Sequence, residues 1–117
     1  MGNNGILKNS IFTNNIISSG LNGASLLINN IVNMTVVNCT FKDSYTQYSG
    51  IIYFSGSGLK VINSTFTSNQ VGANGGAVYI NSGDCLIVNS SFESNVGSWG
   101  GAIYCGSWDG LTVVGSV

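Results

Sequence analysis

The sequence of 117 residues contains no proline, no histidine and no arginine, and only 6% of its residues are charged. It therefore lacks the side chains that most often act as general bases and as stabilisers of anionic transition states. Its net charge is -1, and its three lysines form no cluster that would attract nucleic acid or an anionic membrane surface. We expect a protein that is not an enzyme, binds no nucleic acid and needs no cofactor.

Long hydrophobic runs are absent as well. No run approaches the about 20 apolar residues of a membrane-spanning helix. The first ten residues, MGNNGILKNS, have neither the basic start nor the apolar core of a secretory signal. We therefore expect no membrane insertion by this segment, and any export signal to lie outside it. With 44% hydrophobic residues, however, the chain is too apolar to be disordered.

Four phenylalanines mark a repeat in this apolar chain. They are separated by 29, 25 and 26 residues, and each follows an asparagine by three positions. A fixed period of this size is typical of solenoid proteins. The repeated pairs are Asn9 and Phe12, Asn38 and Phe41, Asn63 and Phe66, and Asn89 and Phe92. We expect units at about 7–34, 35–58, 59–84 and 85–110, with a partial unit at 111–117.

Each unit has the composition of short strands separated by turns. Windows such as LKVINSTF (59–66) and CLIVNSSF (85–92) are β-branched and apolar, and they are bounded by glycine, asparagine, serine and aspartate. Two or three such strands per unit would complete one coil, and successive coils would stack about 4.8 Å apart. The sequence therefore predicts an all-β parallel β-helix of about four coils plus a partial fifth.

Stacked coils place equivalent residues above one another, which predicts inward-facing ladders. The phenylalanines form one ladder, and two aliphatic ladders are formed by Met34, Leu59, Cys85 and Leu111 and by Val36, Val61, Ile87 and Val113. Tyr53, Tyr79 and Tyr104 stack with Leu27, and we expect them to have a structural role.

Asparagines and glycines are expected at the corners of the coil. Stacked amides at Asn38, Asn63 and Asn89 can hydrogen-bond to one another and to turn backbone, and this ladder ends at Gly115. The glycine pairs permit a positive φ or a close backbone approach before the next strand. These pairs are Gly75 and Gly76, and Gly100 and Gly101.

The two recurring motifs resemble those of a known family. The first motif is FxxN, at 12–15, 66–69 and 92–95, and the second is GGA followed by Val or Ile, at 75–78 and 100–103. Their combination is similar to the repeats of chlamydial polymorphic outer membrane proteins. Similar repeats occur in adhesin-like surface proteins of methanogenic archaea and of some protists. The second unit departs from the pattern, with FKDS and SGII. The resemblance implies a right-handed, pectin-lyase-like β-helix in an autotransporter-type passenger, associated with the outer membrane, exposed at the cell surface and used in adhesion.

An enzymatic alternative would depend on the acidic residues, because many parallel β-helices process polysaccharides. The chain has only four: Asp43, Asp84, Glu93 and Asp109. Repeat alignment puts Lys42 and Glu93 in one ladder, two coils apart, where we expect solvated side chains rather than a catalytic pair. Asp84 and Asp109 lie beside glycines in turns, and the nine-residue repeat of calcium-binding rolls is absent. We expect no metal site.

The three cysteines occupy different places in the repeat, so no two stack directly. Cys85 replaces Leu59 and Met34 in a core ladder, which favours a buried apolar role. The other two are Cys39 and Cys105. No CxxC spacing indicates a zinc site.

Loop aromatics are the only residues that suggest a binding site. Tyr48 and Trp99 both come seven residues after a phenylalanine, in the loop before the glycine step, and Trp108 lies in a separate turn. Exposed rings can bind sugars or anchor a protein partner, and the alternative is that these rings cover loop backbone. The sequons at Asn33, Asn38, Asn63 and Asn89 are expected to coincide with the corner asparagines rather than to carry glycans.

These observations favour a non-catalytic, adhesin-like β-helix at the cell surface or outside the cell, with an extracellular or host-cell glycan or protein as its receptor. A carbohydrate-binding or polysaccharide-processing β-helix and a structural spacer are the alternatives. The last residues, LTVVGSV, suggest an open strand edge, so we expect either a fragment of a longer solenoid or end-to-end stacking.

Overall fold

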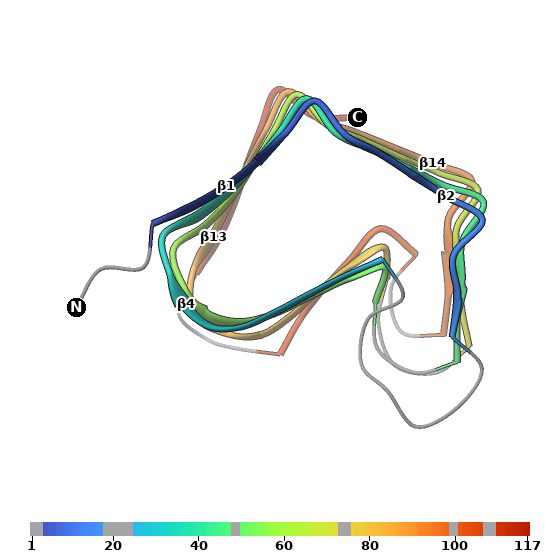
Figure 1. The fold of residues 1–117 in the computed structure, drawn as a ribbon, viewed down its shortest axis with the longest axis horizontal. Helices are drawn as coiled ribbons and strands as arrows, with labels where there is room; N and C mark the ends of the chain where they lie inside the picture. The colour runs from blue at the N-terminus through green and yellow to red at the C-terminus, as the bar shows by residue number, and fades with distance from the viewer. Residues whose placement is uncertain (1–3, 18–24, 48–49, 73–75, 99–100, 107–109) are drawn as a thin grey trace.

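A computed structural model describes residues 4–17, 25–47, 50–72, 76–98, 101–106 and 110–117. All of its regular elements are strands, and they form four parallel sheets. Figure 1, which looks along the stack, shows coils that lie over one another, each passing through the four sheets in turn. The chain is therefore a parallel β-solenoid of about four coils, as the repeat predicts.

The four sheets are numbered by the order in which each coil visits them. The first consists of β1 (Gly5–Lys8), β5 (Met34–Val37), β9 (Leu59–Ile62), β13 (Cys85–Val88) and β17 (Leu111–Val114). The second consists of β2 (Ile11–Thr13), β6 (Thr40–Lys42), β10 (Thr65–Thr67) and β14 (Ser91–Glu93). The third consists of β3 (Ile16–Ile17), β7 (Tyr45–Thr46), β11 (Gln70–Val71) and β15 (Val96–Gly97). The fourth consists of β4 (Leu26–Val32), β8 (Ile52–Ser57), β12 (Val78–Ser82) and β16 (Ile103–Cys105).

Each coil thus has four strands, whereas two or three were expected. The additional strands are those of the third sheet, which are two residues long. A two-residue strand is too short to show the alternation of apolar and polar residues that identifies a strand in a sequence.

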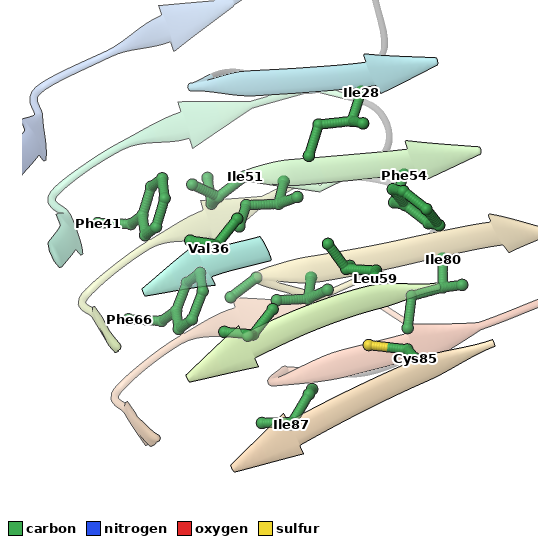
Figure 2. Packing of buried hydrophobic residues seen from close by; sticks show 14 of the residues in the cluster. Ile28, Val36, Phe41, Ile51, Phe54, Leu59, Phe66, Ile80, Cys85 and Ile87 are labelled. Carbon is green, nitrogen blue, oxygen red and sulfur yellow. The ribbon is translucent and has the colours of Figure 1, made fainter. Parts of the chain in front are cut away.

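The core is a set of inward-facing ladders that run through the stack (Figure 2). The phenylalanine rings of the second sheet are nearly parallel, with centroids 4.9, 4.9 and 4.8 Å apart from Phe12 to Phe92. The two predicted aliphatic ladders occupy the first and third positions of the first-sheet strands. Their last members, Leu111 and Val113, are exposed rather than buried, because β17 forms the edge of that sheet.

The corner between the first and second sheets needs a residue with positive φ. Asn38, Asn63 and Asn89 have φ values of 54°, 49° and 49°, and Gly115 continues the position at 57°. Asparagine tolerates this left-handed conformation better than most residues do. The expected amide ladder is present only where Asn38 Nδ2 donates to Asn9 Oδ1 at 3.4 Å, and the described residues show no such bond between Asn38, Asn63 and Asn89.

A second asparagine position forms the hydrogen-bonded ladder instead. Asn69, the last residue of an FxxN motif, is 1% exposed and donates to the Phe41 carbonyl at 2.9 Å and to Asn95 Oδ1 at 2.9 Å. Asn95 donates to the Phe66 carbonyl at 2.8 Å, and the Ser44 amide donates to Asn69 Oδ1 at 3.1 Å. In the last two FxxN motifs the final amide, buried at Asn69 and partly buried at Asn95, therefore bonds to the backbone of the preceding coil.

The glycine steps allow close packing rather than a positive φ. At Gly101, a Cβ atom would lie 2.8 Å from the Asn95 carbonyl oxygen. Gly76 is buried, and neither of these two glycines is among the residues with positive φ. Their partners Gly75 and Gly100 lie outside the described residues. Among the residues that the structure describes, no helix is long and apolar enough to cross a membrane.

Candidate binding surface on the fourth sheet

The three aromatic residues that the sequence suggests as ligand contacts cannot be placed. Tyr48, Trp99 and Trp108 lie outside the described residues. Their role in binding therefore stays a prediction. The described part of the chain presents a different aromatic surface, which the sequence analysis assigns to structure alone.

This surface is formed by Tyr53, Tyr79 and Tyr104, which we call the tyrosine strip. The three residues lie in register on β8, β12 and β16, and Leu27 of β4 continues the ladder. On either side of Tyr79, the side chains of Val78 and Ile80 are buried. Because side chains alternate between the faces of a strand, the tyrosines point outward, and all three are partly exposed.

The rings of the tyrosine strip are stacked on one another. The centroids of Tyr53 and Tyr79 are 5.3 Å apart with an interplanar angle of 11°, and those of Tyr79 and Tyr104 are 4.7 Å apart at 13°. Both faces of the Tyr79 ring are thus covered by its neighbours. Partial burial, and then the neighbouring phenols of Tyr104 and Tyr53, raises the pKa of Tyr79. The phenol therefore remains protonated near neutral pH and can both donate and accept a hydrogen bond.

The strands around the tyrosine strip are polar but uncharged. Ser55 and Ser82, also on the fourth sheet, share a hydrogen bond of 3.2 Å, and Asn29 is exposed. No strand of the fourth sheet contains a charged residue, whereas the first and second sheets carry Lys8, Lys60, Lys42 and Glu93. The outer face of the fourth sheet is therefore an electrically neutral surface with aromatic edges and hydroxyl groups.

The acidic side chains lie at separate places on the coil. Lys42 and Glu93 share a ladder with Thr67 between them, as the repeat alignment predicts. Asp43 lies 3.7 Å from Lys42 Nζ at the surface, and Asp84 Oδ1 accepts a hydrogen bond of 2.9 Å from the Gly58 amide. Asp109 is outside the described residues. In the part of the chain that the structure describes, no three His, Cys, Asp or Glu side chains gather where a metal ion could be held.

A hollow of about 350 Å³ lies where the fourth sheet turns into the first. The described residues of its lining include Lys60, Asp84 and Cys85. Burial, and to a smaller extent Cys105 and Asp84, raises the pKa of the Cys85 thiol to about 12. The thiol is therefore protonated and a poor nucleophile, which agrees with the apolar role expected for Cys85.

Cys39 has a structural role that the sequence analysis missed. It occupies the corner position of Ser64 and Ser90, whose hydroxyls donate to the carbonyl two residues earlier at 3.0 Å and accept from the backbone amide of the preceding coil. The Cys39 thiol donates in the same way to the Val37 carbonyl, at 3.4 Å. Alignment of the position after each corner asparagine would have shown this relation.

A family model described as a right handed beta helix region matches residues 2–117. No curated protein and no solved structure matches the chain.

Proposed function

Because the chain belongs to the right-handed β-helix family, we propose that it is a non-catalytic, adhesin-like segment, exposed on the cell surface or outside the cell, that binds an extracellular receptor. The observation that carries this proposal is the tyrosine strip, a partly exposed aromatic ladder on an uncharged outer face. Tyrosine combines a large contact area with a polar group, and it is enriched in recognition surfaces.

The resemblance to polymorphic outer membrane proteins supports this proposal, but the motif residues themselves face inward. The phenylalanines of FxxN stack in the core, and Asn69 and Asn95 bond to backbone carbonyls. Such residues maintain the coil and touch no receptor. A binding function therefore has to lie on the outward positions, which the motif leaves free to vary.

The placement of the acids supports a non-catalytic role. Glycoside hydrolysis requires two carboxyl groups roughly 5 to 10 Å apart across the substrate. Glu93 shares its ladder with Thr67 and, two coils away, Lys42, and the Asp84 carboxylate accepts a hydrogen bond from a backbone amide. Among the described residues, neither acid is paired with a second acid in its ladder or through its hydrogen bond.

The test is binding of the purified chain to cultured cells and to a glycan array. We expect Tyr79→Ala to reduce binding strongly, since it removes the central ring of the strip. Tyr45→Ala is the matched control, because Tyr45 faces outward from the third sheet and stacks with no ring of the strip. Circular dichroism checks that both variants are folded.

A second variant separates the strip from the loop aromatics. If Tyr48→Ala/Trp99→Ala abolishes binding while Tyr79→Ala does not, the receptor is bound by the loops, and the strip is only structural. If the wild-type chain binds neither cells nor glycans, the adhesin-like role is wrong, and the segment is a spacer.

A further inference from the structure

The geometry of the tyrosine strip also indicates which ligand it accepts. We propose that the strip binds a neutral, extended β-1,4-linked polysaccharide, which lies along the axis of the coil stack and is held by the phenolic hydroxyls rather than by the ring faces. This inference rests on the proposed receptor-binding function and specifies its ligand.

The stacking of the rings determines the mode of contact. A sugar that packs on an aromatic ring needs a free ring face. Tyr79 has none, because Tyr53 and Tyr104 stack on its two sides at 5.3 and 4.7 Å. What remains accessible at Tyr79 is the outer edge of its ring with the phenolic hydroxyl, and Ser55, Ser82 and Asn29 add polar groups on the same sheet.

The repeat distance of the strip selects among linear polymers. The hydroxyl-bearing rings recur every 4.7 to 5.3 Å along the stack, which is close to the length of one pyranose unit in an extended chain. An extended polypeptide presents groups on one side only about every 6.6 Å, so it loses register with the strip after one or two tyrosines. Successive units of a β-1,4-linked glucan are rotated by about half a turn, but each edge of that chain carries hydroxyl groups on every unit, so these hydroxyls can pair with successive phenols.

Charge selects further among polysaccharides. The strands of the fourth sheet carry no lysine, and the raised pKa of Tyr79 keeps its phenol protonated near neutral pH. A nucleic acid or a polyuronate would bring negative charges to a surface that offers no cation to neutralise them, and desolvation of those charges would oppose binding. A neutral chain avoids this cost.

The test is calorimetric titration of the chain with cellohexaose, xylohexaose and mannohexaose, and with the hexamer of β-1,4-glucuronic acid. The last has the backbone of cellohexaose but a carboxylate on every ring. We expect at least one neutral hexamer to bind and the charged hexamer to bind several-fold more weakly. Tyr79→Phe keeps the ring stack and removes one hydroxyl, so it should weaken binding about tenfold, the value of one net hydrogen bond.

Tyr45→Phe is the matched control, which removes a phenol from the third sheet and should leave affinity unchanged. Full affinity in a folded Tyr79→Phe variant would overturn binding through hydroxyls, and equal affinity for the charged hexamer would overturn the preference for neutral chains. If Tyr79→Ala abolishes cell binding but no neutral hexamer binds, the polysaccharide assignment is wrong and the adhesin-like role stands. If a hexamer binds to a chain that does not bind cells, the adhesin-like role is wrong and the ligand assignment stands.

Discussion

At the scale of single residues, the three positions of the corner between the first and second sheets have different structural roles. In the tripeptide Asn63-Ser64-Thr65, the asparagine adopts a positive φ, the buried serine hydroxyl bonds to the Ile62 carbonyl, and the threonine begins β10. The same assignment holds at 89–91, where Ser90 bonds to the Val88 carbonyl. The recurring pattern of Asn-Ser followed by Thr or Ser therefore has a structural origin, independent of its coincidence with the glycosylation signal.

One buried hydroxyl, in contrast to those of Ser64 and Ser90, makes no hydrogen bond among the described residues. Thr46 is 0% exposed, and its Oγ1 is the one buried side-chain N or O atom without a partner among the described residues. An unsatisfied buried hydroxyl costs about 1 to 3 kcal/mol. Since Val71 occupies the next rung of the ladder, we expect Thr46→Val to raise the free energy of unfolding by about 1 kcal/mol.

Urea denaturation measures this change. Thr67→Val, at a partly exposed outward position of the second sheet, serves as the control and should have little effect. An unchanged or lower stability of Thr46→Val would mean that the hydroxyl has a bonding partner, such as a buried water molecule.

At the scale of structural elements, the corner between the second and third sheets depends on a pair of bonded amides. Asn69 connects β6, through the Phe41 carbonyl, to Asn95, which lies directly before β15. It also accepts from the Ser44 amide. The Asn69 side chain therefore connects three coils. The stability of this corner depends on all three, whereas the exposed corner at Asn63 has no such connection within the described part of the chain.

Removal of this amide should be costly. Asn69→Ala leaves the Phe41 carbonyl and the Ser44 amide without these partners, and we expect a loss of at least about 3 kcal/mol in the free energy of unfolding. Asn63→Gly, which keeps the positive φ at an exposed corner, should change it by less than about 0.5 kcal/mol. Thermal and urea unfolding of the two variants check this contrast. Similar losses in both would contradict the different roles of the two asparagine positions.

At the scale of the whole molecule, stability should fall in alkali. Burial raises the pKa of the Cys85 thiol from its ordinary 9.0 to about 12, so the folded chain holds this proton more tightly than the unfolded chain does. The stabilisation is complete below pH 9 and is lost as the pH rises toward 12, at up to about 1.4 kcal/mol per pH unit. The raised pKa of Tyr79 acts in the same direction above pH 10.

Urea denaturation at a series of pH values measures this loss. Cys85→Leu, which places the residue found at Leu59 one coil earlier, should flatten the profile between pH 9 and pH 12. A variant profile as steep as that of the wild type would assign the alkaline loss to other groups.

The sequence by itself determined the repeat and the residues that stack in the core. A period set by Phe12, Phe41, Phe66 and Phe92 is sufficient for this, because every coil must place the same kind of residue at the same point of a narrow interior. It also determined that Cys85 is an apolar core residue, since Leu59 holds the equivalent position.

Only the tertiary structure decided the path of the chain between the core residues of each coil, and whether each ladder of equivalent residues faces the core or the solvent. The strands of the third sheet are too short to leave a pattern, and Asn63 and Asn69 are the same residue type at fixed offsets from Phe66. Their difference, exposed turn against buried ladder, arises from the coils above and below. The tyrosine strip likewise became a candidate binding surface only once its rings were seen to lie outside the coil, stacked face to face, because that arrangement depends on the registry of strands about 25 residues apart.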